Sequence, residues 1–126
     1  MEKGILTQNK VHLQDHEWKT VKYILEQGHN VTLIPPMQIK GMDNPDIEID
    51  GVIWEIKSPT GGGKYTMKHT LENAKHQARN AIVDLRRCKL SDEQAVKELE
   101  HHFTLSKRLR RMKIITKAEK MLDYKK

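Results

Sequence analysis

An Asp-Gly pair between two alternating apolar runs restricts the fold of this chain more than any other feature. Asp50 and Gly51 follow the apolar positions of residues 47–49 and precede those of residues 52–56. An Asp-Gly pair in this setting is the strongest short-range signal for a β-hairpin with a two-residue loop. The sequence therefore predicts a hairpin centred on this pair.

The register of this hairpin places three polar side chains on one face. Counting outward from the turn, Asp46 lies opposite Glu55, and Lys57 projects from the same face as both. Directly opposed side chains have Cβ atoms about 5 Å apart, so two carboxylates repel unless a cation lies between them. The alternative is an exposed polar face with a cross-strand ion pair. The opposite face, which we expect to be buried, carries Ile47, Ile49, Val52, Trp54 and Ile56.

A further acidic residue occurs on the apolar side of a predicted helix. Residues 15–27 carry apolar side chains at helical spacing, and Gly28 then favours a helix end. Glu17 stands four residues before Val21 and seven before Ile24, so it belongs to the stripe that faces the sheet. Burying an unpaired carboxylate is costly, so we expect Glu17 to point at a cation or a hydrogen-bonding site. The alternative is the edge of the stripe, with the carboxylate in water.

A glycine-rich loop follows the hairpin. Residues 58–64 include Pro59 and three consecutive glycines, so this stretch is predicted to be a mobile loop and not regular structure. Lys64 and Lys68 lie beyond the glycines. Because glycines have no side chains and lysines are positively charged, this segment could let the phosphate backbone of a nucleic acid pass close by.

The remaining apolar patterns alternate between helical and strand spacing. Pro35 and Pro36 end a strand over residues 31–34 and begin a loop that extends to Pro45, while Ser91 is predicted to cap a helix. We further expect a helix over residues 67–78 and strands over residues 81–85, 112–116 and 121–124. This order predicts one domain over residues 1–126 with an α/β fold, in which helices flank a mixed central β-sheet.

The composition limits which classes of binding partner and which metal-ligating atoms are expected. The formal net charge of +6 favours polyanionic partners such as nucleic acid, although a basic balance can also serve solubility alone. Cys88 is the only cysteine, so a metal would be held by oxygen or imidazole and not by several thiolates. The seven histidines show no zinc spacing and are predicted to be surface residues. No stretch is apolar enough to span a bilayer, and the N-terminus lacks the apolar core of a signal peptide. We therefore expect a soluble domain.

Two short motifs resemble the PD-(D/E)XK nuclease superfamily. Its signature is a Pro-Asp, a variable spacer and a Glu-X-Lys, and this sequence has Pro45-Asp46 and then Glu55-Ile56-Lys57. The motifs also lie on a predicted hairpin between two predicted helices, as in the core of these nucleases. The resemblance implies a restriction-endonuclease-like fold.

A longer stretch resembles one particular group, the tRNA-cleaving toxin domain at the C-terminus of contact-dependent growth inhibition proteins. Residues 46–60 carry the likeness, followed by a helix with Asn73, Gln77 and Asn80 and then by residues 82–85. The resemblance extends over about residues 11 to 116. It implies a toxin that is exported as part of a larger protein, acts in the cytoplasm of a target cell and is neutralised by a cognate immunity protein.

The resemblance also implies roles for the site residues. Asp46 and Glu55 would bind a divalent cation, Mg²⁺ or Mn²⁺, together with the carbonyl of Ile56. Glu17 would be a further ligand, directly or through water. Lys57 would orient or deprotonate the attacking water, or stabilise the charge of the transition state.

Substrate contacts are expected from several other polar residues. Thr60 and Gln77 resemble positions that contact the substrate or the catalytic lysine, and ordinary surface polarity is the alternative. A basic track on one helix face, with a solvated surface as its alternative, would consist of Lys64, Lys68, Lys75 and Arg79. The basic run Arg108-Leu109-Arg110-Arg111 would be auxiliary.

Two other functions remain open from the sequence. The same superfamily motif fits a DNA endonuclease, because only the narrower likeness points to tRNA. A catalytically silent nucleic-acid-binding module with this fold is the second alternative, although the intact motif residues argue against it.

Overall fold

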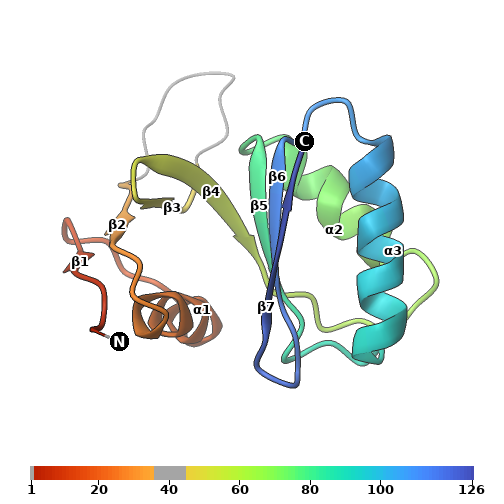
Figure 1. The fold of residues 1–126 in the computed structure, drawn as a ribbon, viewed down its shortest axis with the longest axis horizontal. Coiled ribbons are helices and arrows are strands. Elements are labelled where there is room, and N and C mark those ends of the chain that lie inside the picture. The colour runs from red at the N-terminus through yellow and green to blue at the C-terminus, as the bar shows by residue number, and fades with distance from the viewer. Residues whose placement is uncertain (1, 36–44) are drawn as a thin grey trace.

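The computed structural model describes residues 2–35 and 45–126, and Figure 1 shows their arrangement. The predicted loop before Pro45 therefore lies largely outside the described residues. The elements are β1 (Leu6–Thr7), α1 (Asp15–Glu26), β2 (Val31–Leu33), β3 (Ile47–Ile49), β4 (Val52–Lys57), α2 (Thr66–Lys75), β5 (Asn80–Asp84), α3 (Asp92–Leu105), β6 (Arg111–Ile115) and β7 (Met121–Lys125).

The strands form one mixed sheet whose spatial order, from β1 to β7, equals their order in the chain. β1 and β2 are parallel, and β2, β3 and β4 are antiparallel neighbours. β4, β5 and β6 run parallel, and β7 returns antiparallel beside β6. Parallel neighbours need crossovers, which α1 provides between β1 and β2, α2 between β4 and β5, and α3 between β5 and β6. This topology confirms the predicted α/β fold with a mixed sheet flanked by helices.

Helices cover both faces of the sheet, with α1 on one side and α2 and α3 on the other (Figure 1). Each side has its own buried apolar cluster. Alternate residues of β5 serve the two clusters, because Ile82 joins the α1 side and Val83 joins the α2–α3 side. The strands therefore stand between two cores, and a polar side chain in the middle of the sheet is buried whichever face it projects from.

The hairpin has the predicted turn and register. Asp50 and Gly51 both have positive φ, at 48° and 89°, as a two-residue type I′ turn requires. Ile47 pairs with Trp54 and Ile49 with Val52, as predicted. The carboxylate of Asp50 also accepts a hydrogen bond from the Asn30 N–H at 3.2 Å, which ties the turn to the α1–β2 connection.

The ends of the helices partly match the sequence. The Ser91 hydroxyl accepts a hydrogen bond from the Gln94 N–H at 3.2 Å, so the predicted cap of α3 is confirmed. α1 ends at Glu26, and Gly28 follows with a φ of 90°. α2 ends at Lys75, earlier than predicted, so the residues that follow form the connection to β5.

Candidate active site

Asp46 lies beside β4, where the hairpin register puts it. Its N–H donates to the carbonyl of Trp54 at 3.2 Å, which extends the β3–β4 ladder by one residue. Its carboxylate Oδ2 accepts the N–H of Ile56 at 2.9 Å. The side chain is thus held next to Glu55, the residue that the register places opposite it.

Glu55 is a buried carboxyl group with an unused oxygen. Only 1% of the residue is exposed, because α2 covers the face of β4 from which it projects. Its Oε2 lies 3.2 Å from the ammonium of Lys57, whereas its Oε1 has no hydrogen-bond partner. Burial raises the pKa of Glu55 to about 9, the nearby carboxyl of Asp46 adds to the increase, and Lys57 acts against it.

Lys57 is fixed between two side chains. Its ammonium pairs with Glu55 and donates a hydrogen bond of 2.7 Å to Oε1 of Gln77, in the α2–β5 connection. The structure thus joins Gln77 to the predicted catalytic lysine. A side chain held by two oxygen atoms cannot swing freely, so its positive charge stays beside the two carboxyl groups.

A polar depression of about 390 Å³ opens beside Lys57. Thr60, a predicted substrate residue, lines it. The other wall is a polar stripe of α2 that sequence reasoning did not select as a binding surface, although its spacing could have shown it: Thr66, His69, Thr70 and Asn73. No carboxylate is among the lining residues, so the depression suits an anionic or hydrogen-bonding ligand.

The Glu17 carboxylate is engaged in the N-terminal cap of α1, so its role at the site stays a prediction. It is the N3 residue of α1, and its carboxylate accepts the N–H of Gln14 at 3.0 Å in a capping box. Glu17 is half-buried, and its carboxylate satisfies an N–H group at the helix start that has no partner within the helix. Within the described residues, no group of three or more acidic, histidine or cysteine side chains could hold a metal ion.

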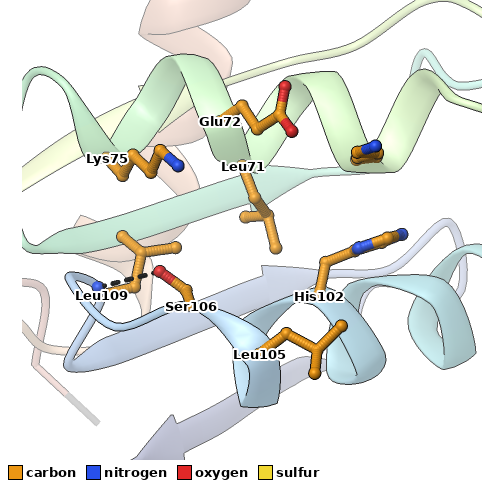
Figure 2. A pocket seen from close by; sticks show the side chains of 8 residues that line it. Leu71, Glu72, Lys75, His102, Leu105, Ser106 and Leu109 are labelled. Atoms are coloured by element: carbon orange, nitrogen blue, oxygen red, sulfur yellow. Dashed lines mark hydrogen bonds between the residues drawn. The ribbon is translucent and has the colours of Figure 1, made fainter.

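The predicted basic track is broken up in the structure. Lys64 precedes α2 and Arg79 follows it, so the four residues do not share one helix face. Lys64 lies over the ring of Tyr65, with 5.6 Å between the ammonium and the ring centroid. Lys68 and Lys75 line the groove between α2 and α3 and not the depression. Figure 2 shows Lys75 in this groove. Lys68 therefore does not line the depression beside Lys57.

The glycine-rich loop is irregular, as predicted, but it is anchored. The Gly61 carbonyl accepts hydrogen bonds from the Lys89 N–H and the Cys88 thiol, both at 3.2 Å. A Cβ on Gly62 would lie 2.9 Å from the Cβ of Lys89, closer than real Cβ contacts come. The loop is packed against the β5–α3 connection, and this contact fixes the floor of the depression near Thr60.

A second buried carboxylate, Asp84, provides a comparison, because its hydrogen-bonding capacity is satisfied within the protein. Asp84 is 2% exposed. It pairs with Arg86 at 2.7 Å and accepts a hydrogen bond of 2.6 Å from Thr20. Burial alone would raise its pKa, but the bonds from Arg86 and Thr20 outweigh burial and hold the pKa below its usual value. Glu55 has Lys57 beside Oε2 but no partner at Oε1, which leaves a place for a ligand at this almost fully buried carboxyl group.

Comparison with known proteins identifies a family. The sequence matches the family described as contact-dependent growth inhibition CdiA C-terminal domain over residues 43–121. No curated protein matches the sequence. No helix in residues 2–35 or 45–126 is long and apolar enough to cross a membrane.

The structure is similar to a chain of the "CdiA-CT/CdiI toxin and immunity complex from Burkholderia pseudomallei". The TM-score is 0.74, the match covers 98% of this chain and 100% of that chain, and the identity is 19%. At this identity the likeness shows a shared fold. The family match is the stronger result, because it covers more than half of the sequence and includes the whole hairpin. The protein therefore belongs to the family of CdiA C-terminal domains, the toxin domains of contact-dependent growth inhibition.

Proposed function

We propose that this toxin domain is a divalent-metal-dependent endonuclease that cleaves tRNA. The observation that carries the proposal is Glu55, a buried carboxyl group whose Oε1 has no partner and which lies beside both Asp46 and Lys57. A purely structural carboxyl group would be satisfied, as Asp84 is. The combination of two carboxyl groups and a lysine on one hairpin is also the core of the PD-(D/E)XK signature.

The residues present fit a hard divalent cation such as Mg²⁺ or Mn²⁺. Asp46 and Glu55 would hold it through carboxylate oxygens, and Ile56 would add its carbonyl. A cation there would supply positive charge to the phosphodiester and activate water as a nucleophile. It would also satisfy Oε1 of Glu55. Glu17 keeps a proposed role only through water or after a rearrangement, because its carboxylate is bound in the helix cap.

Lys57 would act as a fixed positive charge. In hydrolysis, a water oxygen attacks the phosphorus, the bond to the leaving oxygen breaks, and the departing oxygen takes up a proton. Negative charge grows on the phosphate oxygens during this step. The ammonium of Lys57, held by Gln77 and Glu55, would stabilise that charge and orient the water. Thr60 would contact the phosphate or sugar from the wall of the depression.

The proposed partners follow from family and charge. A net charge of +6 supports a polyanionic substrate, and tRNA is the substrate that the longer sequence likeness implies. The solved chain with this fold is described as part of a toxin and immunity complex, which supports a cognate immunity protein for this chain too. We also propose that the domain is exported within a larger protein and acts in the cytoplasm of a target cell.

A substrate panel tests the proposal. Bulk tRNA, ribosomal RNA and plasmid DNA are each incubated with the domain, with Mg²⁺ or with a chelator, and loss of intact nucleic acid is measured. We expect Mg²⁺-dependent loss of tRNA and none with Asp46→Asn, which keeps the fold because the amide oxygen can still accept the Ile56 N–H. Cleavage of plasmid alone would instead assign a DNA endonuclease, and no cleavage by the folded protein would favour a binding module.

A further inference from the structure

Basic side chains gather at the edge of the sheet where β5 and β6 begin and β7 ends. The Arg110 N–H donates to the carbonyl of Arg79 at 2.7 Å, and the Lys126 N–H donates to the carbonyl of Arg110 at 2.9 Å. Figure 1 shows the α3–β6 connection and the C-terminus together at this edge. We call this surface the basic edge, and it consists of Lys75, Arg79, Lys107, Arg108, Arg110 and Lys126.

The charge of the basic edge is not balanced within the protein. Five of its six residues are exposed, and none takes part in the ion pairs found among the described residues. Burial lowers the pKa of Lys126, and repulsion from the neighbouring positive charge of Arg110 adds to the decrease. Lys75 is half-buried and continues the edge into the α2–α3 groove, where Glu72 is the acidic neighbour (Figure 2). An external polyanion would relieve this repulsion.

The basic edge adjoins the candidate active site along the chain. Gln77, which holds Lys57, is two residues before Arg79. Ala81, two residues after Arg79, pairs with Glu55 across the β4–β5 ladder. Between them, the Asn80 side chain donates to the carbonyl of Ile53 at 2.9 Å and fixes this junction to β4. A polyanion at the active site would therefore have its flanking charges next to Arg79.

We propose that the basic edge binds the phosphate backbone of the RNA substrate beside the scissile phosphodiester. This inference rests on the proposed nuclease function and adds a surface to it. The guanidinium groups of Arg79, Arg108 and Arg110 can each bind a phosphate through two parallel hydrogen bonds. Such contacts set affinity and position without reading sequence. The auxiliary run around Arg108 thus becomes part of the main binding surface.

The test measures binding of fluorescein-labelled bulk tRNA in a chelator, so that no cleavage is needed. The full chain is compared with the triple variant Arg79→Gln, Arg108→Gln, Arg110→Gln, whose side chains make no hydrogen bonds in the described structure. The control triple variant removes three other exposed positive charges, by Lys3→Gln, Lys22→Gln and Lys97→Gln. Affinity is measured between about 50 and 200 mM salt, because each lost phosphate contact lowers the slope of log affinity against log salt by about 0.7–0.9.

We expect the arginine variant to lose about two units of slope and at least about tenfold in affinity at 50 mM salt, with the control close to wild type. Equal losses in both variants would show non-specific attraction and overturn the inference. Unchanged binding by the arginine variant would overturn it too. Binding is measured without cleavage, so the two proposals can fail independently. If the arginine variant binds tRNA normally, the nuclease proposal is unaffected. If the protein cleaves no nucleic acid, the binding comparison can still be interpreted.

Discussion

At the scale of single residues, Glu55 is where burial and charge conflict most directly. Its carboxyl group is almost completely buried, yet one oxygen has no partner. Without a cation, the raised pKa of about 9 keeps the group protonated at neutral pH. A cation at Oε1 would compete with that proton, so the same burial that disfavours the free carboxylate prepares it to exchange a proton for a metal ion.

This conflict predicts a pH dependence of stability. The unfolded chain loses the Glu55 proton near pH 4.5, whereas the folded protein keeps it to about pH 9. The contribution of Glu55 is therefore fully present below pH 4.5 and is lost as the pH rises toward 9, with a slope of at most about 1.4 kcal/mol per pH unit. Glu55→Gln keeps a neutral side chain and removes this slope.

Urea unfolding in a chelator at pH 5 and pH 8 measures the effect. We expect the stability of Glu55→Gln, relative to wild type, to increase between these pH values by roughly 1 kcal/mol or more. Glu48→Gln, which removes a half-buried carboxylate on β3, is the matched control and should follow the wild type. A constant difference between Glu55→Gln and wild type would mean that Glu55 is ionised in the free protein.

Residue type alone does not tell which carboxylates lie together at the candidate site. The positions of Asp46, Glu55 and Lys57 follow from turn chemistry and strand alternation, and both are local properties of the sequence. Glu17 fits two local rules at once, as a member of an apolar stripe and as the third residue after a helix cap. Hydrogen bonding at the helix start prevailed, because four N–H groups there lack partners within the helix.

At the scale of elements, the anchored glycine-rich loop decides the shape of the depression beside Lys57. The loop reaches α2 through Gly63, whose N–H donates to the Thr66 hydroxyl at 3.0 Å, and it reaches the β5–α3 connection through Gly61. Sequence composition predicts the irregular backbone. It does not predict the anchoring, because Cys88 and Lys89 lie more than twenty residues away and meet the loop only in the folded protein.

Two neighbouring glycines test the role of this loop. Gly62→Ala puts a Cβ 2.9 Å from the Cβ of Lys89, so the loop must move, whereas Gly63→Ala makes only an ordinary contact of 3.5 Å with Thr66. We expect Gly62→Ala to reduce the rate of tRNA cleavage by about tenfold, because small displacements at a site are costly. Gly63→Ala should remain within about twofold of wild type. Equal rates for both variants would show that the loop does not shape the site.

At the scale of the whole molecule, the sheet between two cores explains which parts of the fold and of the candidate site could be predicted from the sequence and which could not. Strand and helix periodicities predict a mixed sheet with helices, and the hairpin register fixes one half of the site. The other half comes from α2 and its connection to β5, which supply His69, Asn73 and Gln77. No local pattern states how α2 lies across β4, because that depends on the packing of the α2–α3 core.

The same packing explains the fate of the predicted basic residues. The apolar side of α2 packs on the sheet and α3, so its polar residues divide between two surfaces. Lys68 and Lys75 line the α2–α3 groove, where Figure 2 shows Lys75, whereas His69 and Asn73 line the depression at the candidate active site. Positive charge does lie near the candidate site, but on the basic edge and not on one face of α2. The basic edge is where the α2–β5 connection, the α3–β6 connection and the end of β7 meet.

The rate of Mg²⁺-dependent tRNA cleavage by Glu55→Gln, compared with wild type and Glu48→Gln, tests the central claim most directly. The two variants each remove one carboxylate from the same hairpin face, but only Glu55 lies between Asp46 and Lys57. The account predicts a loss of at least about 100-fold for folded Glu55→Gln and no more than about twofold for Glu48→Gln. Wild-type cleavage by folded Glu55→Gln would contradict it, because the site would then lie elsewhere in the protein.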